Sequence, residues 1–591
     1  MSVSQNFPTI EPSLNLSFAN TKALDSRITF SRPTDAVYYD GKTVTKAEEN
    51  LFIYSQEFDN SFWRAFGAST VTANATTAPD GTTTADRVAA NSANTSNGAF
   101  ETTVTASVGS TISFFAKADT VNFVAVGTAL VSFDAWFNLT TGTVESSFAC
   151  TASIVDFGNG WYRCILANVT IGASRILITP KPTTGTGDPW SNVPSAIGDS
   201  VYLWGAQLEA RDTVTAYTPT TTQPITNYIP TLLTAPSNTA RFDHNPVTGE
   251  SLGLLIEEQR TNLLTYSEDY SNASWSKIAL NLTSNTIIAP DGALTGSKIS
   301  STTGTWSSGL AVGTVSVASS SISIYAKAGE APILQIATYT YGNFQCYFDL
   351  TTGVSNGTVG FTRTMTDVGN GWWRCTVSGT LTVGGAFIFI PMAVNSGLNP
   401  APIGQGIYLW GAQLEAGAFP TSYIKTEASQ VTRSADSASM TGANFSDWYR
   451  ADEGTVYCES SASFVSSGSV AYSPFSLNDG TSANAVAPQY NSNAINTLVR
   501  SSAVEVARMI YSPVLANAFY KTAIYLKNND YATSTNGSVV VVDALGTMPS
   551  GINVLDIGKT YLNLQTLNGT IKKISYYPQR LTNENLQALT S

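Results

Sequence analysis

The residues that could do acid–base or nucleophilic chemistry are few along this 591-residue chain. His244 is the only histidine, and no Gly-x-Ser-x-Gly element accompanies it to complete a catalytic triad. We interpret His244 as a surface turn residue in a loop-like segment. The pairs Glu48–Glu49 and Glu257–Glu258 cannot flank one glycosidic bond, because neighbours on a strand point to opposite faces. We therefore predict a protein that is not an enzyme.

The cysteines show neither metal-site nor disulfide spacing. They are odd in number, far apart, and no pair has the Cys-x-x-Cys spacing of zinc sites. A bridge across a hairpin between Cys150 and Cys164 is one alternative, but we predict buried free thiols. The five are Cys150, Cys164, Cys346, Cys375 and Cys458.

Charge is sparse and acidic. Only 12% of residues are charged, against roughly 25% in an ordinary protein, and the formal net charge is −12. Without clusters of Lys and Arg the chain lacks a phosphate-binding surface, which excludes nucleic acid as a partner. No apolar run reaches the roughly 18 residues of a membrane span, so we expect no membrane insertion. The first residues, Met-Ser-Val-Ser-Gln, have no pattern typical of a secretion signal.

A long internal duplication organises the chain. Asn50-Leu-Phe-Ile-Tyr-Ser returns as Asn262-Leu-Leu-Thr-Tyr-Ser, and five further motifs follow in the same order at nearly constant spacing. The clearest is Tyr-Leu-Trp-Gly-Ala-Gln-Leu-Glu, which occupies 202–209 and 408–415. Each copy spans about 170 residues, which is far longer than a solenoid repeat. The copies are therefore two whole domains.

The residues of both copies predict an all-β fold. Strand formers are interrupted every 8 to 12 residues by Gly, Asn, Asp or Pro, a pattern typical of β-sandwiches. In 322–327, apolar Ile322, Ile324 and Ala326 alternate with polar or aromatic residues, as in a half-buried strand. The one convincing helix is 581–589, with Thr582 as its N-cap.

These patterns divide the chain into five parts. We expect an N-terminal segment over 1–49, a sandwich over 50–225, a connector over 226–261, a second sandwich over 262–428 and a third over 429–591. The first segment is too short for a core of its own, yet it is rich in apolar residues. We therefore predict that it packs on a neighbouring subunit or on the structure to which the protein is attached.

The tryptophans are the candidate ligand contacts. Those that recur in both copies follow an apolar strand face or an Asn-Gly turn, and we predict structural roles for them. These are Trp161, Trp204, Trp372, Trp373 and Trp410. Three others break the symmetry of the repeat, and we predict that they contact a glycan. These are Trp136, Trp190 and Trp306.

Several motifs resemble a known class of proteins. The segment from Arg241-Phe-Asp-His-Asn-Pro246 through 253–268 closely resembles one that recurs in tail fibres and other appendages of tailed bacteriophages. The start of the same unit resembles Ile28-Thr-Phe-Ser-Arg32, and 419–426 resembles its end. In that family the start runs directly into the Arg-Phe-Asp segment, whereas here the first sandwich lies between them as though inserted.

The sandwiches resemble further families. The two copies are similar to the galactose-binding-like jelly rolls of carbohydrate-binding modules, many of which hold a structural calcium. Glu57 and Glu268 match the position of one calcium ligand, but Trp-Gly-Ala replaces the usual acidic residues of the closing strand. The last 160 residues resemble the concanavalin-A-like (laminin-G-like) sandwich that ends many phage fibres. The resemblance thus implies tandem jelly rolls and a lectin-like sandwich, with no cofactor except a weakly supported calcium.

Together these features predict a non-enzymatic structural protein of a tailed-phage virion, a tail fibre in particular, assembled in the host bacterial cytoplasm. Its expected partners are other tail, neck or capsid proteins through the N-terminal segment, further copies of itself as a trimer, and host-surface polysaccharide. One alternative is a capsid or neck decoration protein that acts as a spacer without a receptor role. The other is a glycan-binding module array of a cellular protein.

Overall fold

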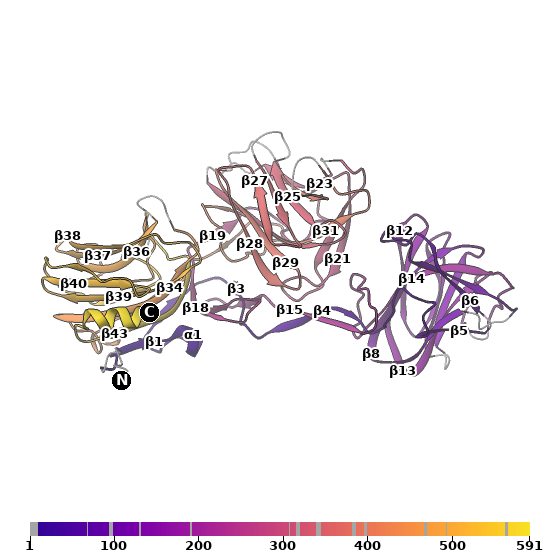
Figure 1. The fold of residues 1–591 in the computed structure, drawn as a ribbon, viewed down its shortest axis with the longest axis horizontal. Helices are drawn as coiled ribbons and strands as arrows, with labels where there is room; N and C mark the ends of the chain where they lie inside the picture. Colours follow the sequence, from indigo (N-terminus) through magenta and orange to yellow (C-terminus); the bar gives the residue numbers. More distant parts are fainter. Residues whose placement is uncertain are drawn as a thin grey trace. The chain divides into compact units, whose positions relative to one another are not determined.

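The computed structural model describes residues 10–67, 69–93, 98–128, 132–189, 192–305, 308–314, 319–338, 344–380, 386–394, 399–465, 470–491, 493–561 and 565–591. In these residues the chain is all-β with tandem sandwiches, as predicted, and antiparallel strands build its sheets (Figure 1). The helices are α1 (Phe18–Thr21), α2 (Ala443–Ser446) and α3 (Asn583–Thr590). Thr582 caps α3 by accepting a hydrogen bond from the backbone N–H of Asn585, as predicted. No described helix is both long and apolar enough to cross a lipid bilayer.

The first sandwich is built around two strands of 21 residues each, β8 (Gly98–Ala118) and β13 (Trp161–Lys181). The other strands are β5 (Trp63–Phe66), β6 (Ser69–Thr76), β7 (Ala85–Ala90), β9 (Phe123–Thr128), β10 (Asp134–Asn138), β11 (Thr143–Phe148), β12 (Thr151–Gly158) and β14 (Ser200–Glu209). One layer has the order β5-β8-β13-β9-β10-β11 and the other β6-β7-β14-β8-β13-β12. Both long strands take part in both layers, which joins the ten strands into one sheet.

The second sandwich repeats this order in two separate sheets. Its strands are β20 (Trp275–Ile278), β21 (Leu280–Ile287), β22 (Gly296–Ser301), β23 (Gly309–Thr314), β24 (Ser320–Ala328), β25 (Ile333–Thr338), β26 (Gln345–Asp349), β27 (Val354–Gly357), β28 (Thr362–Gly369), β29 (Trp372–Gly379), β30 (Ala386–Met392) and β31 (Gly406–Ala416). The sheets run β20-β23-β30-β25-β26-β27 and β21-β22-β31-β24-β29-β28. Strands β23 and β24 take the place of β8, and β29 and β30 the place of β13. The strand orders therefore agree, as the duplication predicts.

The third sandwich has two sheets that enclose one hydrophobic core. Its own strands are β33 (Ser437–Thr441), β34 (Glu453–Ala462), β35 (Phe475–Asn478), β36 (Ala485–Asn491), β37 (Ala494–Ser501), β38 (Val504–Tyr511), β39 (Phe519–Lys527), β40 (Asp530–Thr535), β41 (Val541–Asp543), β42 (Val554–Ile557) and β43 (Gly569–Tyr577). Strands β1 (Leu14–Leu16), β2 (Thr29–Ser31), β17 (Arg241–His244) and β18 (Ser251–Ile256) join them from outside this range. The sheets run β17-β18-β43-β34-β39-β40-β41, with β1 on β43, and β2-β33-β42-β35-β36-β37-β38.

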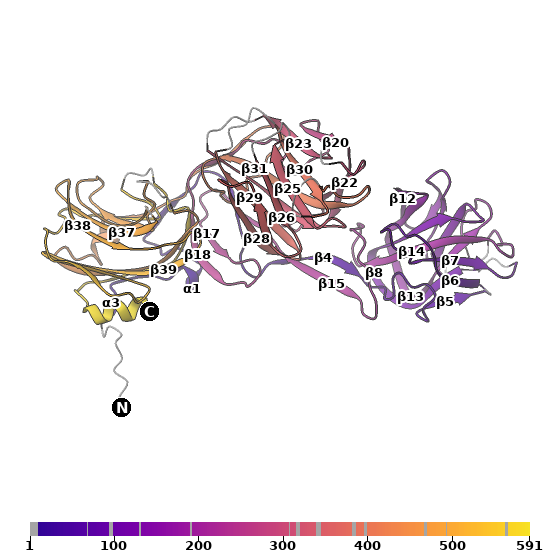
Figure 2. The same ribbon diagram turned by 45° about the horizontal axis from the view of Figure 1, so that its top comes forward.

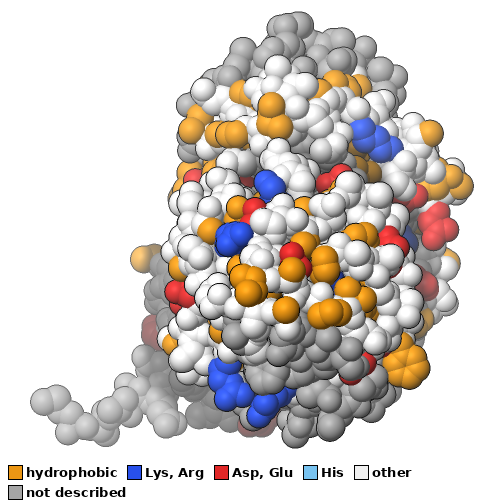
Figure 3. Space-filling model, turned by 90° about the vertical axis from the view of Figure 1, so that its right-hand side faces the viewer, with side chains coloured by type: hydrophobic (Ala, Val, Ile, Leu, Met, Phe, Trp, Pro, Cys, Tyr) orange, Lys and Arg blue, Asp and Glu red, His pale blue; other side chains and the backbone are white. Residues whose placement is uncertain are grey.

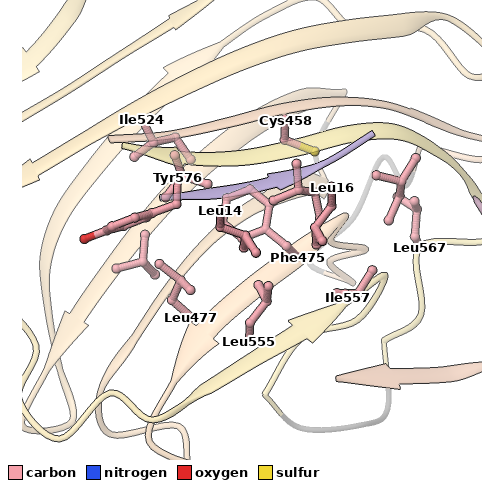
Figure 4. Close-up of a cluster of buried hydrophobic side chains, with 14 of the residues drawn as sticks. Leu14, Leu16, Cys458, Phe475, Leu477, Ile524, Leu555, Ile557, Leu567 and Tyr576 are labelled. Carbon is pink, nitrogen blue, oxygen red and sulfur yellow. The ribbon is translucent and has the colours of Figure 1, made fainter. Parts of the chain in front are cut away.

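The N-terminal segment is therefore part of the third sandwich. Strand β1 pairs with β43, and Leu14 and Leu16 are almost fully buried in the core that β43 also lines (Figure 4). Phe18 is buried in the same core. The expectation that these apolar residues pack on a neighbouring subunit is wrong, because they lie in the core of the third sandwich, together with Leu254 and Ile256 of β18. The attachment role inferred from them loses its physical basis.

Three short two-stranded ribbons complete the description. Strand β3 (Ala36–Tyr38) pairs with β16 (Leu233–Ala235), β4 (Val44–Asn50) with β15 (Ile225–Pro230), and β19 (Arg260–Asn262) with β32 (Val431–Arg433). The contacts within the chain divide it into two compact units. The first unit comprises 1–44, 230–284 and 298–591, and the second comprises 45–229 and 285–297. The connector predicted over 226–261 thus contributes its central strands to the third sandwich.

A buried ionic cluster lies in the first unit, where several distant segments meet. Asp436 accepts a hydrogen bond from Arg32 Nη1 at 3.0 Å and another from Arg241 Nη2 at 2.6 Å. It also accepts the backbone N–H of Glu257 at 2.9 Å. The members of the cluster, all at most 6% exposed, are Arg32, Arg241, Glu257, Arg433 and Asp436.

Glu257 is the second acid of the ionic cluster. Its carboxylate lies 2.9 Å from Arg241 Nη1 and 3.6 Å from Arg433 Nη2, and it accepts both the N–H and the hydroxyl of Ser422. Burial by itself raises the pKa of Glu257, but the guanidinium groups of Arg433 and Arg241 and the bonds from Ser422 outweigh it and lower the pKa to about 2. Glu257 is therefore ionised at neutral pH and joins the second sandwich, through Ser422, to the connector.

We expect Leu16→Ala to destabilise the third sandwich, although Leu16 lies far from it in sequence. Removing a buried leucine side chain from a packed core costs about 2–5 kcal/mol. Denaturant unfolding followed by tryptophan fluorescence measures the change, with the exposed Glu11→Ala as the control. An unfolding midpoint equal to that of the control would contradict the burial of β1 in this core.

The ionic cluster predicts acid sensitivity with a definite sign. Because the folded-state pKa of Glu257 is lowered from its usual 4.5 to about 2, its stabilisation is complete above pH 4.5 and is lost as pH falls toward 2. The shift corresponds to about 3 kcal/mol. Glu257→Gln should lose a similar amount at pH 7, because Arg241 and Arg433 are left with less counter-charge. Denaturant unfolding at several pH values measures this. Between pH 5 and pH 2.5 the free energy of unfolding should fall less in the variant than in the parent protein. An equal fall in both proteins would contradict the lowered pKa of Glu257.

Candidate functional site

The tryptophans that recur in both copies are structural, as predicted. Trp204 packs between Phe115 and Tyr217, with ring centroids 5.2 and 4.8 Å away, and is 3% exposed. Trp410 packs between Tyr325 and Tyr423 at the same two distances and is 1% exposed. Such rings have no free face for a sugar. Trp161 and Trp372 are equally buried, and Trp373 donates its indole N–H to the carbonyl of Leu350.

The asparagine that opens each copy ties the first strand to the closing strand. Asn50 donates to the carbonyls of Ala206 and Thr218 and accepts from the N–H groups of Phe52 and Leu208. Asn262 makes the equivalent four bonds. Its partners are the carbonyls of Ala412 and Ile424 and the N–H groups of Leu264 and Leu414. The most repeated motifs of the sequence are therefore explained by internal hydrogen bonding rather than by a ligand.

The structure contradicts one of the three glycan-contact predictions. Trp136 is 0% exposed: its indole N–H donates to the carbonyl of Gly187 at 2.8 Å, and the Lys181 ammonium lies 5.6 Å from its ring centre. A Cβ built on Gly185 would lie 2.7 Å from the ring, so the segment that follows Lys181 covers the indole closely. Trp190 and Trp306 lie outside the described residues.

The calcium candidates are not brought into a cluster. Glu57 is exposed, and Glu268 accepts a hydrogen bond from Tyr423 and lies 2.7 Å from the Lys425 ammonium. Among the described residues, no group of three or more His, Cys, Asp or Glu side chains is placed to hold a metal ion. Neither glutamate has the surroundings of a six- to eight-oxygen calcium site within the described part of the chain.

His244 is not a surface turn residue, and this prediction is wrong. It ends β17, is 2% exposed, and its Nδ1 lies 3.1 Å from the carbonyl oxygen of Tyr39 and 2.9 Å from that of Phe242. The Tyr38-Tyr-Asp-Gly hairpin covers the ring. Gly41 has a φ of +71°, and a Cβ there would lie 2.5 Å from the imidazole. The histidine is thus a packing residue without an approach for a substrate.

The five cysteines are free thiols. Cys150 is half-buried and the other four are buried. Burial raises the pKa of Cys150 to about 11 and that of Cys458 to about 12, so neither is a thiolate near neutral pH.

The best candidate site is the outer face of the third sandwich's β36 and β37, which we call the polar face. On these strands Val486, Tyr490, Ile495 and Val499 point into the core. Side chains alternate along a strand, so their neighbours point to the opposite face of the sheet. The members of the polar face are Ala485, Ala487, Gln489, Asn491, Ala494, Asn496, Leu498 and Arg500.

The main contacts among the described helices and strands do not place another element over the polar face. Helix α3 covers the outer face of the other sheet, where Leu581 and Leu586 pack on Tyr525 and Ala532. Figure 2 shows α3 on one side of this sandwich and β37 and β38 on the other. The polar face thus lies on the side of this sandwich away from α3, and its side chains are largely buried: Ala485 and Ala487 are 1% exposed and Asn491 is 8% exposed.

Three amides form the centre of the polar face. Gln489 lies opposite Asn496 in the β36–β37 register, and Asn496 Nδ2 donates to Asn491 Oδ1. This leaves the Gln489 amide, Asn491 Nδ2 and Asn496 Oδ1 without partners among the described residues. The three residues are 5–8% exposed. Free amide donors and acceptors side by side suit a ligand rich in hydroxyl groups.

The polar rows continue onto the neighbouring strands. Asn478 on β35 donates to the Asp556 carboxylate at 2.9 Å and to the Ser476 hydroxyl at 3.2 Å. Ser476 lies opposite Asp556, which in turn lies opposite Ser439 on β33. The polar rows thus continue across five adjacent strands, but Ser476 and Asn478 are fully buried and are bonded within the face.

Sequence reasoning missed the polar face, although a signal was present. In 485–491 the apolar Val486 and Tyr490 alternate with Gln489 and Asn491, and Asn496 falls in phase on the next run. An amide-rich face opposite an apolar one is the pattern that should have indicated a ligand surface. The prediction of glycan contacts rested on tryptophan and therefore missed this face, which has no aromatic residue.

No protein-family model and no curated protein matches the chain. Solved structures with some similarity include the CBM40 of a Ruminococcus gnavus sialidase, at 15% identity over 24% of this chain and 84% of that one, with a TM-score of 0.21. The tandem CBM22 domains of Paenibacillus barcinonensis Xyn10C match at 13% identity over 63% of this chain and 99% of that one, with a TM-score of 0.19. A point mutant of the NanB sialidase from Streptococcus pneumoniae matches at 15% identity over 26% of each chain, with a TM-score of 0.22. Likenesses this distant leave function to be argued from the chain's own residues.

We expect Asn50→Ala and Asn262→Ala to destabilise their sandwiches to a similar degree. Each variant leaves two carbonyls and two N–H groups unpaired in the interior, and an unsatisfied buried group costs about 1–3 kcal/mol. Thermal unfolding measures the loss, with the exposed Asn281→Ala as the control. If either variant has the same melting temperature as the control, the hydrogen bonds of this asparagine do not stabilise the pairing of the first and closing strands.

Proposed function

We propose that this chain is a non-enzymatic glycan-binding protein and that the polar face of its third sandwich holds the sugar. The observation that carries the proposal is the row of amide groups at Gln489, Asn491 and Asn496, which lie on the sheet face opposite the core and keep donors and acceptors without partners among the described residues. Amide groups in this arrangement can accept from and donate to neighbouring hydroxyls of one sugar ring. That is the type of contact that fixes a polyhydroxylated ligand.

The proposal extends to a place in a tailed-phage particle. The resemblance of 241–268 and 419–426 to tail-fibre segments supports an appendage that contacts polysaccharide on the host surface, working as a homo-oligomer beside other virion proteins. Figure 3 faces the first jelly roll, where uncharged polar and backbone atoms are interspersed with hydrophobic and charged side chains. Many weak, uncharged contacts of this kind gain affinity when several copies bind together.

The two jelly rolls are proposed as spacers. Their recurring tryptophans and asparagines are used internally, and Trp136 has no free face. This supports the spacer alternative for residues 50–428, while the third sandwich keeps the binding role.

Glycan binding by the full chain tests the proposal. We expect the double variant Gln489→Ala/Asn491→Ala to weaken binding about tenfold or more, which is what losing roughly 1.4 kcal/mol of hydrogen bonding implies. The control is Gln579→Ala, an exposed glutamine of the same sandwich. Circular dichroism should show both variants folded. Undiminished binding by the folded double variant would place the site elsewhere or remove it.

A further inference from the structure

The charged groups around the polar face neutralise one another. Asp556 lies 3.4 Å from the Lys559 ammonium, which also donates to Ser437. On the other side, Glu505 on β38 binds the Arg508 guanidinium through both carboxylate oxygens, at 2.6 and 2.7 Å. The carboxylates of Asp556 and Glu505 therefore already have partners of opposite charge.

Arg500 differs from these groups: among the described residues it forms no ion pair, and its buried Nε has no hydrogen-bond partner. It lies opposite Glu505 in the β37–β38 register, and it donates to the carbonyl of Ala503. The same glutamate therefore faces two guanidinium groups, and its pKa is lowered mainly by hydrogen bonds from Arg508 and also by the charge of Arg500. An incoming carboxylate at this edge would compete with Glu505 for Arg508 and meet the negative charge of Glu505.

The centre of the face carries no charge. Gln489, Asn491 and Asn496 are neutral, and alanines lie next to them at 485, 487 and 494. A carboxylate or sulfate placed here would lose its hydration without gaining an arginine or lysine, which is strongly unfavourable. The whole chain, at −12, also repels acidic polymers at long range.

We infer that the polar face selects neutral glycans, recognised by hydrogen bonds to their hydroxyls, and rejects glycans that carry carboxylate or sulfate groups. This inference rests on the proposed function of the same face. Because no net charge is paired on binding, the affinity is nearly independent of ionic strength. Because the face has no aromatic residue, ring stacking contributes nothing at its centre.

The experiment compares two classes of probe on the full chain. Neutral oligosaccharides of glucose, galactose and mannose, and acidic oligosaccharides of galacturonate and sialic acid, are titrated by calorimetry at about 0.05 M and about 0.5 M NaCl. We expect binding by at least one neutral probe, with affinities at the two salt concentrations within about twofold, and no binding by the acidic probes. Arg508→Gln should leave the neutral affinity within about twofold, because its guanidinium is paired with Glu505.

The possible outcomes distinguish a failure of the inference from a failure of the proposed function. Acidic probes that bind tightly at low salt and weakly at high salt would overturn the inference while leaving a glycan-binding protein. Loss of neutral binding in Arg508→Gln would also overturn it, because a charged contact would then be required. Absence of binding by every probe would contradict the proposed function itself.

Discussion

The buried ionic cluster of Arg32, Arg241, Glu257, Arg433 and Asp436 holds together segments that are hundreds of residues apart. Ion pairs without water are stable only when each charge keeps its partners, because an unpaired buried charge costs several kcal/mol. The N-terminal segment, the connector and the end of the second sandwich must therefore be in place together. Arg32, Arg241 and Glu257 come from motifs that resemble tail-fibre segments, so the resemblance marks a structural junction.

The strands that flank the ionic cluster complete the third sandwich and so support its polar face. Arg32 follows β2, which pairs with β33 in the sheet that carries the polar face, and Arg241 begins β17 in the opposite sheet. Asp436 immediately precedes β33. One cluster thus fixes the entry of strands into both sheets. The amides of β36 and β37 gain a rigid support, which a binding surface built on weak hydrogen bonds needs.

Local patterns of the sequence predicted the parts of the fold that local chemistry controls. Alternation and turn residues gave the all-β class, the repeat gave equal strand orders, and Thr582 gave the helix cap. Leu14 and Leu16 were misplaced because their core comes from residues about 450 positions later, and no local pattern encodes that distance. The prediction that His244 is exposed was wrong for the same reason, because the hairpin around Gly41, distant in sequence, packs on its ring. The prediction that Trp136 contacts a glycan was wrong because a residue that differs between the two copies need not be exposed. The amides of the polar face were not predicted because no aromatic residue marks them.

The central claim is that a neutral sugar lies on the polar face of the third sandwich. The most direct measurement is a crystal structure of the chain soaked with a neutral oligosaccharide that it binds in solution. The account predicts density for a sugar ring over β36 and β37, with hydroxyls within hydrogen-bond distance of Gln489, Asn491 and Asn496. A sugar bound instead on either jelly roll, with the three amides left in contact with water, would contradict it.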